Sequence, residues 1–579
     1  MRRVPILIAL IMSVALRAEA EPRLYEICHG YKIESKSPTS FNANERKLIC
    51  GDPKAVSWQD IPRFQAEYFI RTFLQERGYF FPVFRSERDY VIVEPGEKTH
   101  IDGIEVKGNP PEWFRVWKRR KIDGAPLTPT ILSALEDWTK NQLKARGFAC
   151  PKAATEADAV SGRVTLTVQP DERVRILSVD EEEVEKLRPG TLRRFDAFHV
   201  GDIYDNRNLT LTARRIGIDG ILQSSYFLTE CTPEGAKLTQ KSIPGAKRLV
   251  SVGFGASTEE YFIIKGVWKQ ARIGKNGSSF QVAGRGSYRK QRLFITGHVY
   301  PLPFPTRWHL RPSLSTRREN EKKYEYLSTD IWLPPAVTWD TPGWGFELTF
   351  GPKFNFTRTF KGAQSGWTHF LSLATTLEMM SHDYEYYIAD PRSGYTLRTY
   401  ADLASGKIAS TASAQRLGFN GQALWNIAGL EPPLLIFGIR GSAATTITEF
   451  NGPDYARLPP WMFHYLGGSA NMRGFSRMGL PKTNRGSLTS IYAGAELRLA
   501  NILPLNLQPI AFVDVGALGN RSFDLGYPAY WSPGLGIRWP SFIGVVRLTF
   551  ARGYLINNND PDNLRLSHWQ FYFTLGEEF

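Results

Sequence analysis

Side chains that could carry out catalysis are present in this sequence of 579 residues, but they do not form a known catalytic pattern. The nine histidines form no H-E-x-x-H pair, and the chain has no G-x-x-x-x-G-K-[ST] phosphate loop and no G-x-S-x-G nucleophile turn. The glycine-flanked segment Gly274-Lys275-Asn276-Gly277 indicates a turn. We therefore expect no enzymatic activity, no cofactor and no metal site.

Three carboxylates close together in the sequence could mimic the acid and base of a hydrolase. They are Asp383, Glu385 and Asp390, and the stretch around them is polar. Polar stretches between apolar segments are typical of loops, so we expect these residues to lie in an exposed loop. A hydrolase is therefore an alternative that depends on these three residues alone.

The first twenty residues have the features of a secretion signal. Arg2 and Arg3 give a positive start, an apolar run extends from Val4 to Leu16, and Ala18-Glu19-Ala20 is a small-x-small cleavage site. The alternative is an anchor helix, but a run of about 13 residues is shorter than the roughly 20 that a spanning helix needs. We expect residues 1–20 to be a signal peptide and the mature chain to begin outside the inner membrane.

The four cysteines form no C-x-x-C pair, and no histidine lies at zinc-ligand spacing from them. An exported chain meets an oxidising compartment, where disulfides are stable. Cys28 and Cys50 flank one short polar segment and are the more favoured pair. Cys150 and Cys231 follow two similar segments, and the sequence leaves open whether they are paired or free.

Charge and composition exclude several classes of protein. Lys and Arg number 72 against 57 Asp and Glu, a formal charge of +15, but the two signs are interleaved. The densest basic run, Trp117-Lys118-Arg119-Arg120-Lys121, is short and no recognised module accompanies it, so we expect no nucleic-acid partner. An aromatic content of 13% excludes a disordered chain. No segment after the leader has the roughly 20 apolar residues of a spanning helix, which excludes a helical membrane bundle.

Between residues 21 and 245 the hydrophobic pattern alternates between helix-like and strand-like segments. Helices are predicted over three segments: Ile61–Arg77, Thr130–Arg146 and Asn208–Ile216. The pattern recurs about every 70 residues, which predicts repeated α+β units. Their expected ranges are 21–98, 99–172 and 173–245, although the long polar segment 21–56 leaves the start of the first unit open.

From about Ser251 onward, apolar residues recur at every second position. In the segment Ser490–Leu499 they alternate with Tyr492, Glu496 and Arg498 on the other parity. Many segments of about ten such residues predict a transmembrane β-barrel, because a sheet in hydrocarbon must close to satisfy its backbone. A soluble β-sandwich is the alternative, but the alternation covers about 330 residues and tryptophans gather at the predicted strand ends. We expect sixteen strands over residues 246–579.

Four segments of the barrel region occur in an order that resembles the Omp85 superfamily. They are Leu466–Phe475 with Arg473-Gly474-Phe475, the strand containing Glu496, the run Phe512-Val513-Asp514-Val515-Gly516, and the chain end with Trp569, Phe571, Phe573 and Phe579. The aromatic ending resembles an outer-membrane β-signal. The repeats before the barrel resemble POTRA domains.

The resemblance implies N-terminal α+β POTRA repeats followed by a 16-stranded antiparallel transmembrane β-barrel. It places the barrel in the outer membrane of a Gram-negative-type cell and the POTRA repeats in the periplasm. It also implies that the segment with Arg473 folds into the barrel lumen. A buried guanidinium needs carboxylates, and the planar fork of arginine suits two of them. We therefore expect Arg473 to pair with Glu496 and Asp514, with Phe512 and Gly516 beside them.

Within the superfamily, three POTRA-like units make the chain similar to the TamA-like branch, the outer-membrane subunits of the translocation and assembly module. The implied function is assembly and insertion of outer-membrane proteins, with client strands received at POTRA sheet edges and released through a weak barrel seam. The implied partners are the outer-membrane lipid bilayer, unfolded outer-membrane protein clients and a TamB-like partner anchored in the inner membrane. The alternatives are a two-partner-secretion-type pore that exports one dedicated protein, and a structural scaffold or adhesin.

Overall fold

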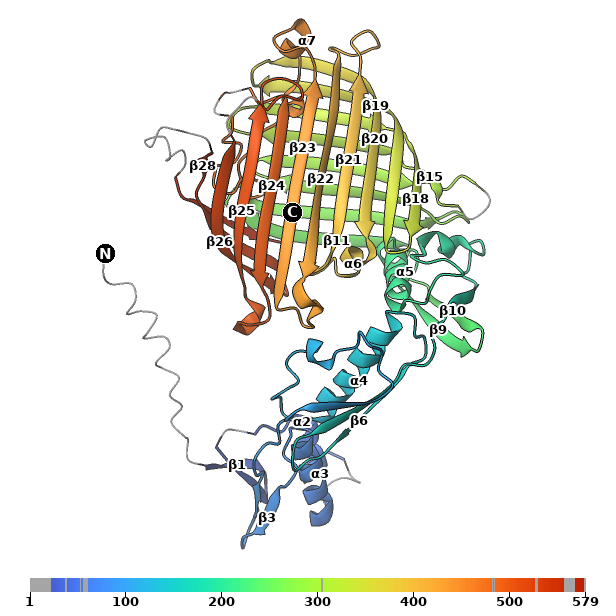
Figure 1. Ribbon diagram of the computed structural model, residues 1–579, viewed down its shortest axis with the longest axis vertical. Coiled ribbons are helices and arrows are strands. Elements are labelled where there is room, and N and C mark those ends of the chain that lie inside the picture. Colours follow the sequence, from blue (N-terminus) through green and yellow to red (C-terminus); the bar gives the residue numbers. More distant parts are fainter. Residues whose placement is uncertain are drawn as a thin grey trace, which may run out of the picture. The chain divides into compact units, whose positions relative to one another are not determined.

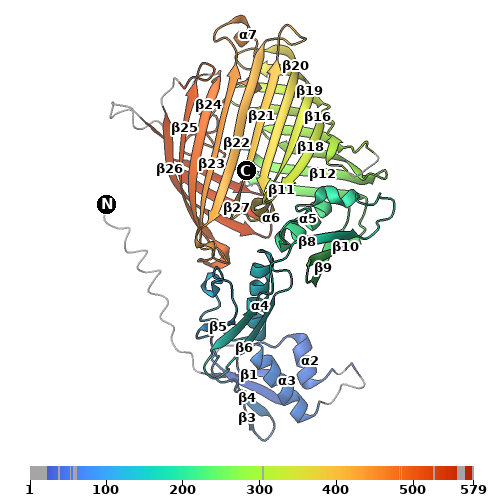
Figure 2. The same ribbon diagram turned by 45° about the vertical axis from the view of Figure 1, so that its right-hand side comes forward.

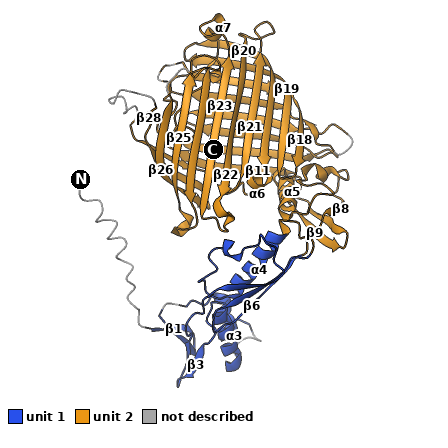
Figure 3. Ribbon diagram, viewed as in Figure 1, with its two compact units in different colours: residues 1–143, 151–171 blue, residues 144–150, 172–579 orange. Residues whose placement is uncertain are grey.

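The computed structural model describes residues 22–36, 39–52, 54–55, 61–302, 306–481, 483, 485–525, 529–556 and 568–576. Three small sheets with helices precede one large closed sheet along the chain (Figure 1, Figure 2). The chain divides into two compact units, residues 1–143 with 151–171 and residues 144–150 with 172–579 (Figure 3). The expected signal peptide and Phe579 lie outside the described residues. No helix among the described residues is long and apolar enough to span a membrane.

The first small sheet has its strands in the order β1-β2-β4-β3. The bounds are β1 Arg23–Cys28, β2 Tyr31–Ser35, β3 Val83–Ser86 and β4 Val91–Glu94. Helices α2 (Ala43–Cys50) and α3 (Arg63–Gln75) share a core with it, in which Ile33, Ile70 and Leu74 are buried. A disulfide between Cys28 and Cys50 joins β1 to α2. The prediction missed β1, β2 and α2, since their residues are mostly polar or half-exposed.

The second small sheet has the order β5-β7-β6. Its elements are β5 Ile104–Gly108, the short 3₁₀ helix η2 Val116–Lys118, α4 Pro129–Lys144, β6 Lys152–Ala157 and β7 Val164–Gln169. Helix α4 is amphipathic, and its Leu135 and Leu143 are fully buried, as is Leu166 on the central strand. The apolar stripe that predicted a helix over Thr130–Arg146 is therefore the face that covers the sheet.

The third small sheet has the order β8-β10-β9 and belongs to the second unit. Its elements are β8 Ile176–Glu181, η3 Thr191–Phe195, α5 Asn206–Ile218, β9 Ser224–Thr232 and β10 Gly235–Ile243. Asp205 caps α5 by accepting a hydrogen bond from the backbone N–H of Arg207 at 2.8 Å. The Cys150–Cys231 disulfide joins the segment before this sheet to β9, which answers the question that the sequence left open.

The large sheet closes on itself, and its neighbouring strands are antiparallel. Its segments are β11 Arg248–Ser257, β12 Tyr261–Ile273, β13 Ser278–Ser287, β14 Lys290–His298, β15 Trp308–Leu310, β16 Ser313–Asn320, β17 Glu325–Trp332, β18 Pro335–Thr341, β19 Trp344–Lys361, β20 Gly366–Ser381, β21 Gly394–Ala404, β22 Ala414–Asn426, β23 Leu435–Ile447, β24 Thr489–Leu499, β25 Gln508–Gly519, β26 Tyr530–Ser541, β27 Gly544–Ala551, β28 Tyr554–Leu555 and β29 Gln570–Leu575. Short helical turns lie between them: α6 His382–Tyr386, η4 Ile427–Gly429, α7 Pro453–Ala456, η5 Pro460–Met462 and η6 Pro504–Asn506.

The described part of the barrel has sixteen strands, as the sequence predicted, because three of them are each broken into two segments. The broken strands are β15 with β16, β17 with β18, and β27 with β28. Side chains alternate between the two faces along each strand. On β24, for example, Ile491 and Leu497 are exposed on the outer face, whereas Tyr492 and Arg498 are buried.

The segment between β23 and β24 packs against the inner face of this barrel. Its Trp461 and Met462 pack with Tyr326 of β17 and Phe370 of β20. Further along, its Met472 and Phe475 pack with Tyr492 of β24 and Leu518 of β25. A segment that contacts strands so far apart around the barrel must lie in the lumen. We call residues 448–488 the lumen loop.

Candidate functional site

Arg473 is fully buried in the lumen loop, and its guanidinium faces two acids on neighbouring strands. Its Nε and Nη2 donate to Asp514 Oδ2 and Oδ1 at 2.8 and 2.9 Å. Its Nη1 donates to Glu496 Oε2 at 2.7 Å, and its backbone N–H donates to Asp514 Oδ2 at 3.1 Å. The guanidinium carbon lies 3.3 Å from the centre of the Phe512 ring. The structure thus brings together the arginine, the two acids and the aromatic ring named from the sequence.

The register of β24 and β25 explains why the two acids face one guanidinium. Glu496 is the Cα partner of Phe512, and Asp514 is the Cα partner of Gly494. A Cβ at Gly494 would lie 2.5 Å from the Tyr492 hydroxyl and 2.7 Å from an Asp514 carboxylate oxygen. The glycine therefore leaves the space that the Asp514 side chain occupies.

Further arginines surround the same acids and were not singled out from the sequence. Glu496 accepts from Arg498 Nε at 2.9 Å and from Arg547, while Arg440 Nη2 lies 3.5 Å from Asp514 Oδ1. The Tyr492 hydroxyl also donates to Asp514, at 2.9 Å. The alternation had placed Tyr492 and Arg498 on the same parity as Glu496, so part of the signal was present. The sequence did not show that these side chains would meet Arg473 of the lumen loop at one place in the barrel.

The glycine and phenylalanine that follow Arg473 fit the loop against the wall. A Cβ at Gly474 would lie 2.5 Å from the backbone carbon of Arg552, so only glycine allows this close approach. Phe475 is buried and meets Tyr530 edge to face with ring centres 5.4 Å apart. The three residues therefore have distinct roles: charge pairing, close approach and apolar packing. Gly516 lies under the same loop, where a Cβ would come 2.9 Å from Leu466.

The lumen loop is also held at the place where the barrel closes. Ser469 donates through its backbone N–H (3.3 Å) and its hydroxyl to Glu259, on the turn between β11 and β12. Arg477 Nη1 lies 3.7 Å from the same Glu259 and its Nη2 pairs with Glu321 at 2.7 Å. From the other side, the Tyr572 hydroxyl on β29 donates to the Phe475 carbonyl at 2.7 Å. The loop therefore contacts both flanks of the closure.

The closure itself is short. Among the described residues, two pairs of Cα partners join β11 to β29, Ala256 with Leu575 and Ser257 with Thr574. Next to them, the Thr258 backbone N–H donates to the Phe573 carbonyl at 3.1 Å. Ten pairs join β11 to β12, and six join β27 to β29. We call the contact between β11 and β29 the seam.

The sequence matches the model of a family described as the Omp85 superfamily domain over residues 273–579, more than half of the chain. The chain belongs to the Omp85 superfamily. Members of this superfamily are outer-membrane β-barrels, which agrees with the apolar outer face described above. The family match covers Arg473, both of its acids and β29.

Solved structures similar to this Omp85 protein include BamA from Haemophilus ducreyi lacking POTRA domains 1–3, at 15% identity and a TM-score of 0.48. That similarity covers 83% of this chain and 100% of the other. CdiB from Acinetobacter baumannii is 14% identical, with 82% and 89% covered and a TM-score of 0.45. CdiB from Escherichia coli is 15% identical, with 93% and 99% covered and a TM-score of 0.45.

The aromatic residues at the end of this Omp85 chain lie on and just before β29. Trp569 and Phe571 are exposed and Phe573 is half-buried, whereas Tyr572 between them points into the barrel interior toward the loop. The fourth residue of the expected β-signal, Phe579, is outside the described range. Trp569 and Phe571 thus lie on the outer face of the strand that borders the seam.

The expectation that Asp383, Glu385 and Asp390 lie in an exposed loop is confirmed for Asp390, which lies in the loop after α6 with its side chain 47% exposed, and is wrong for the other two. Asp383 and Glu385 belong to helix α6 and pair with Arg207 and Arg215 of α5, each at 2.7 Å. Asp390 pairs with Arg538 at 2.9 Å. The arginines of α5 are about 170 positions away in the sequence, so local polarity could not reveal them.

The same junction between the third small sheet and the barrel holds a buried acid, Asp196. Its backbone carbonyl accepts from Arg307 at 2.8 Å, and its carboxylate accepts from Arg193 at 3.1 Å. Burial raises the pKa of Asp196 to about 7, since loss of solvent outweighs the opposing effect of Arg193 and Arg307. Within the described residues, the third sheet is therefore fastened to the barrel by several ion pairs.

Proposed function

We propose that this Omp85 protein is an outer-membrane assembly factor of the TamA-like kind, which inserts client β-strands through its seam. The observation that carries the proposal is the closure of β11 on β29, which shows two pairs of Cα partners within the described part of the chain. An unpaired strand edge offers a row of N–H and C=O groups to any strand that can align with it. Among the described residues, which end at Gly576, residues 248–255 of β11 have no Cα partner on β29, and we propose that this stretch is the edge that a client strand meets.

The outer face of β11 supports a seam that opens toward lipid. Val250, Val252 and Phe254 are 73%, 64% and 62% exposed, and they alternate along the strand. Exposed apolar side chains at such density are stable against hydrocarbon and unfavourable against water. A client strand that pairs with β11 would therefore enter the bilayer as it folds.

The small sheets offer further edges where clients could first bind. Strand β9 is one of the two outer strands of the third sheet and is nine residues long. Its Tyr226 and Leu228 are about half exposed on one face. A client strand added beside β9 would gain main-chain hydrogen bonds and two apolar contacts. We propose that these sheets are POTRA domains in the periplasm. A TamB-like partner anchored in the inner membrane could also bind them there.

A two-partner-secretion-type pore remains the alternative function. Transporters of that type usually have two POTRA units and a plug helix before them. Here three small sheets precede the barrel, and the first described helix, α2, already belongs to the first of these sheets. The lumen is instead occupied by the lumen loop. These features favour assembly over secretion of one dedicated protein.

The test is to lock the seam with a disulfide. The double variant Ser257→Cys, Thr574→Cys joins two Cα partners across the seam. The control variant Ala495→Cys, Val513→Cys joins Cα partners on β24 and β25, away from the seam. The outer-membrane proteome is compared in cells with the wild-type protein, each variant and no protein. Reductant is then added to each strain. Because reductant also breaks the two native disulfides, the control variant shows how much of any change comes from their loss.

We expect the locked seam to reproduce the proteome of the deletion strain and reductant to restore the wild-type pattern. The control variant should resemble the wild-type protein throughout. If the locked seam supports a normal outer-membrane proteome, the assembly proposal is wrong. Loss of one secreted protein with an unchanged outer-membrane proteome would instead favour the secretion pore.

A further inference from the structure

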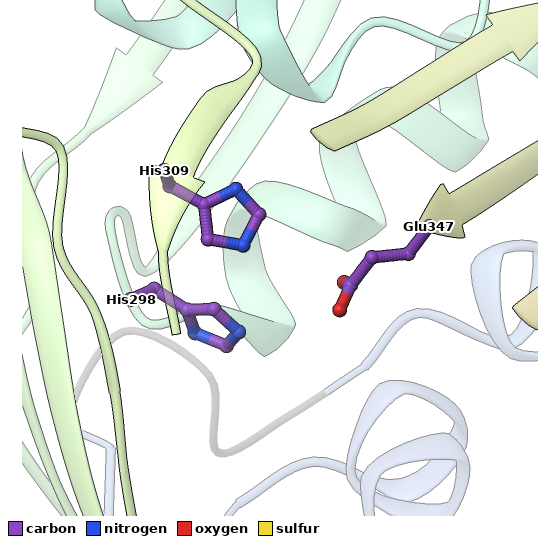
Figure 4. Close-up of side chains that lie close together, drawn as sticks. All are labelled: His298, His309 and Glu347. Atoms are coloured by element: carbon purple, nitrogen blue, oxygen red, sulfur yellow. The ribbon is translucent and has the colours of Figure 1, made fainter. Parts of the chain in front are cut away.

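Two histidines and a glutamate come together at the barrel end that carries the third small sheet. His298 is the last residue of β14, His309 lies on β15 and Glu347 lies on β19. Each offers one ligand atom, and these atoms lie within 4.8 Å of one another. Figure 4 shows the Glu347 carboxylate pointing toward the two imidazole rings. The three residues form no short sequence motif, so no pattern in the sequence indicated a metal site here.

The hydrogen bonding of His309 leaves one ring nitrogen ready for a ligand. Its Nδ1 lies 3.3 Å from the carbonyl oxygen of Arg307. A carbonyl can only accept, so Nδ1 carries the hydrogen and Nε2 holds the lone pair. Nε2 is buried and has no hydrogen-bond partner among the described residues, in a side chain that is only 3% exposed. A lone pair buried in this way is unfavourable unless a donor or a cation meets it.

This arrangement is typical of histidines that bind metals. Such a histidine donates its other ring N–H to a carbonyl or carboxylate, which fixes the ring and its tautomer. The Arg307 carbonyl has this position relative to His309. The ring of His298 meets that of His309 edge to face, with ring centres 5.3 Å apart. Both imidazoles therefore face a common space.

Glu347 can supply the third ligand. Its Oε1 accepts from Arg311 and, at 3.4 Å, from the Thr349 hydroxyl. These contacts hold the carboxylate in place and leave Oε2 for a cation. The residues border a cavity of about 570 Å³, which is large enough to supply water as a fourth ligand. Asp219, Asp340 and Glu378 line the same cavity and offset the charge of its arginines.

We propose that His298, His309 and Glu347 form a binding site for a divalent transition-metal ion, with Zn²⁺ as the best match. Two imidazole nitrogens and one carboxylate suit Zn²⁺, whereas Mg²⁺ and Ca²⁺ prefer oxygen ligands alone. Tetrahedral zinc with bonds of about 2.1 Å separates its ligand atoms by about 3.4 Å. Small side-chain rotations would bring the three atoms to that spacing. The ion would tie β14, β15 and β19 together beside helix α5.

The test uses the full mature protein in detergent, purified through a tag without histidines and stripped with a chelator. Co²⁺ is added as a spectroscopic substitute for Zn²⁺, because four-coordinate Co²⁺ has strong visible bands. We expect about one Co²⁺ per chain, with bands that disappear when Zn²⁺ is added. His309→Ala and Glu347→Gln should weaken Co²⁺ binding at least about tenfold. His369→Ala, an exposed histidine on β20, is the matched control and should bind like the wild-type protein.

Heat-modifiable mobility on a gel shows whether each variant has folded. Wild-type protein without four-coordinate Co²⁺ bands would overturn the proposal. Folded Glu347→Gln protein that binds Co²⁺ as tightly as the wild type would do so as well. If His309→Ala does not fold, the proposal is judged from the Co²⁺ bands of the wild-type protein and from the Co²⁺ affinity of Glu347→Gln. Weaker binding in the His369→Ala control would show that the ion binds elsewhere and would also refute the site.

Discussion

Replacing Arg473 by alanine tests whether the lumen loop is held by the buried ion pairs. The substitution removes the three hydrogen bonds that the guanidinium donates to acids that are 0% and 8% exposed, and it keeps the backbone N–H that also donates to Asp514. Removal of one partner from a buried ion pair costs ~3–5 kcal/mol. Other donors stay on both acids, namely Tyr492 on Asp514 and Arg498 on Glu496. We therefore expect the free energy of unfolding to fall by about 3 kcal/mol, the lower end of that range.

The assay is a urea titration in detergent, read as the fraction of barrel that keeps its heat-modifiable mobility. The matched control is Arg318→Ala, which breaks an exposed pair with Glu325 at 2.6 Å, with side chains 51% and 21% exposed. Exposed pairs contribute up to about 1 kcal/mol, so this variant should stay close to the wild type. Arg473→Lys keeps the charge without the fork and should fall between the two. Equal stability of Arg473→Ala and Arg318→Ala would refute the reasoning.

Three further outcomes follow from the described contacts. Tyr572→Phe removes the hydrogen bond to the Phe475 carbonyl and should cost about 1 kcal/mol and raise barrel conductance in planar bilayers; unchanged conductance would contradict the role of this contact. Gly474→Ala places a Cβ 2.5 Å from the Arg552 backbone and should reduce the yield of folded barrel, whereas Gly266→Ala, with nothing within 4 Å, should not. Burial raises the pKa of Asp196 from 3.8 to about 7, so its stabilising contribution is complete below pH 3.8 and is lost as the pH rises through 7. Thermal unfolding of Asp196→Asn should therefore depend less on pH over this range, and an unchanged dependence would show that another group is responsible.

The barrel and its lumen acids follow from local pattern, because a strand repeats every two residues and one face must be apolar. The alternation alone placed Glu496 on the inner parity. The apolar stripe of Thr130–Arg146 likewise predicted α4 to within two residues. The order of the four barrel segments then predicted which arginine the acids would meet.

Contacts between distant segments could not be predicted in this way. Nothing near Asp383 in the sequence indicates that Arg207 will pair with it across about 170 positions. The approach of His298 and His309 to Glu347 depends on which barrel strands end at the same rim. Strands β1 and β2 were missed because two short, half-exposed strands have too few apolar residues to show an alternation.

The lumen loop bears on the permeability of the membrane as well as on the strength of the closure. The loop is hydrogen-bonded to Glu259, on the turn after β11, and to Tyr572 on β29. Separation of β11 from β29 would therefore break at least one of these contacts. In the proposed function, the loop that occupies the barrel lumen would therefore have to move before a client strand could pair with β11. The proposed lateral entry of a client strand and the permeability of the lumen would then depend on the same movement of the loop.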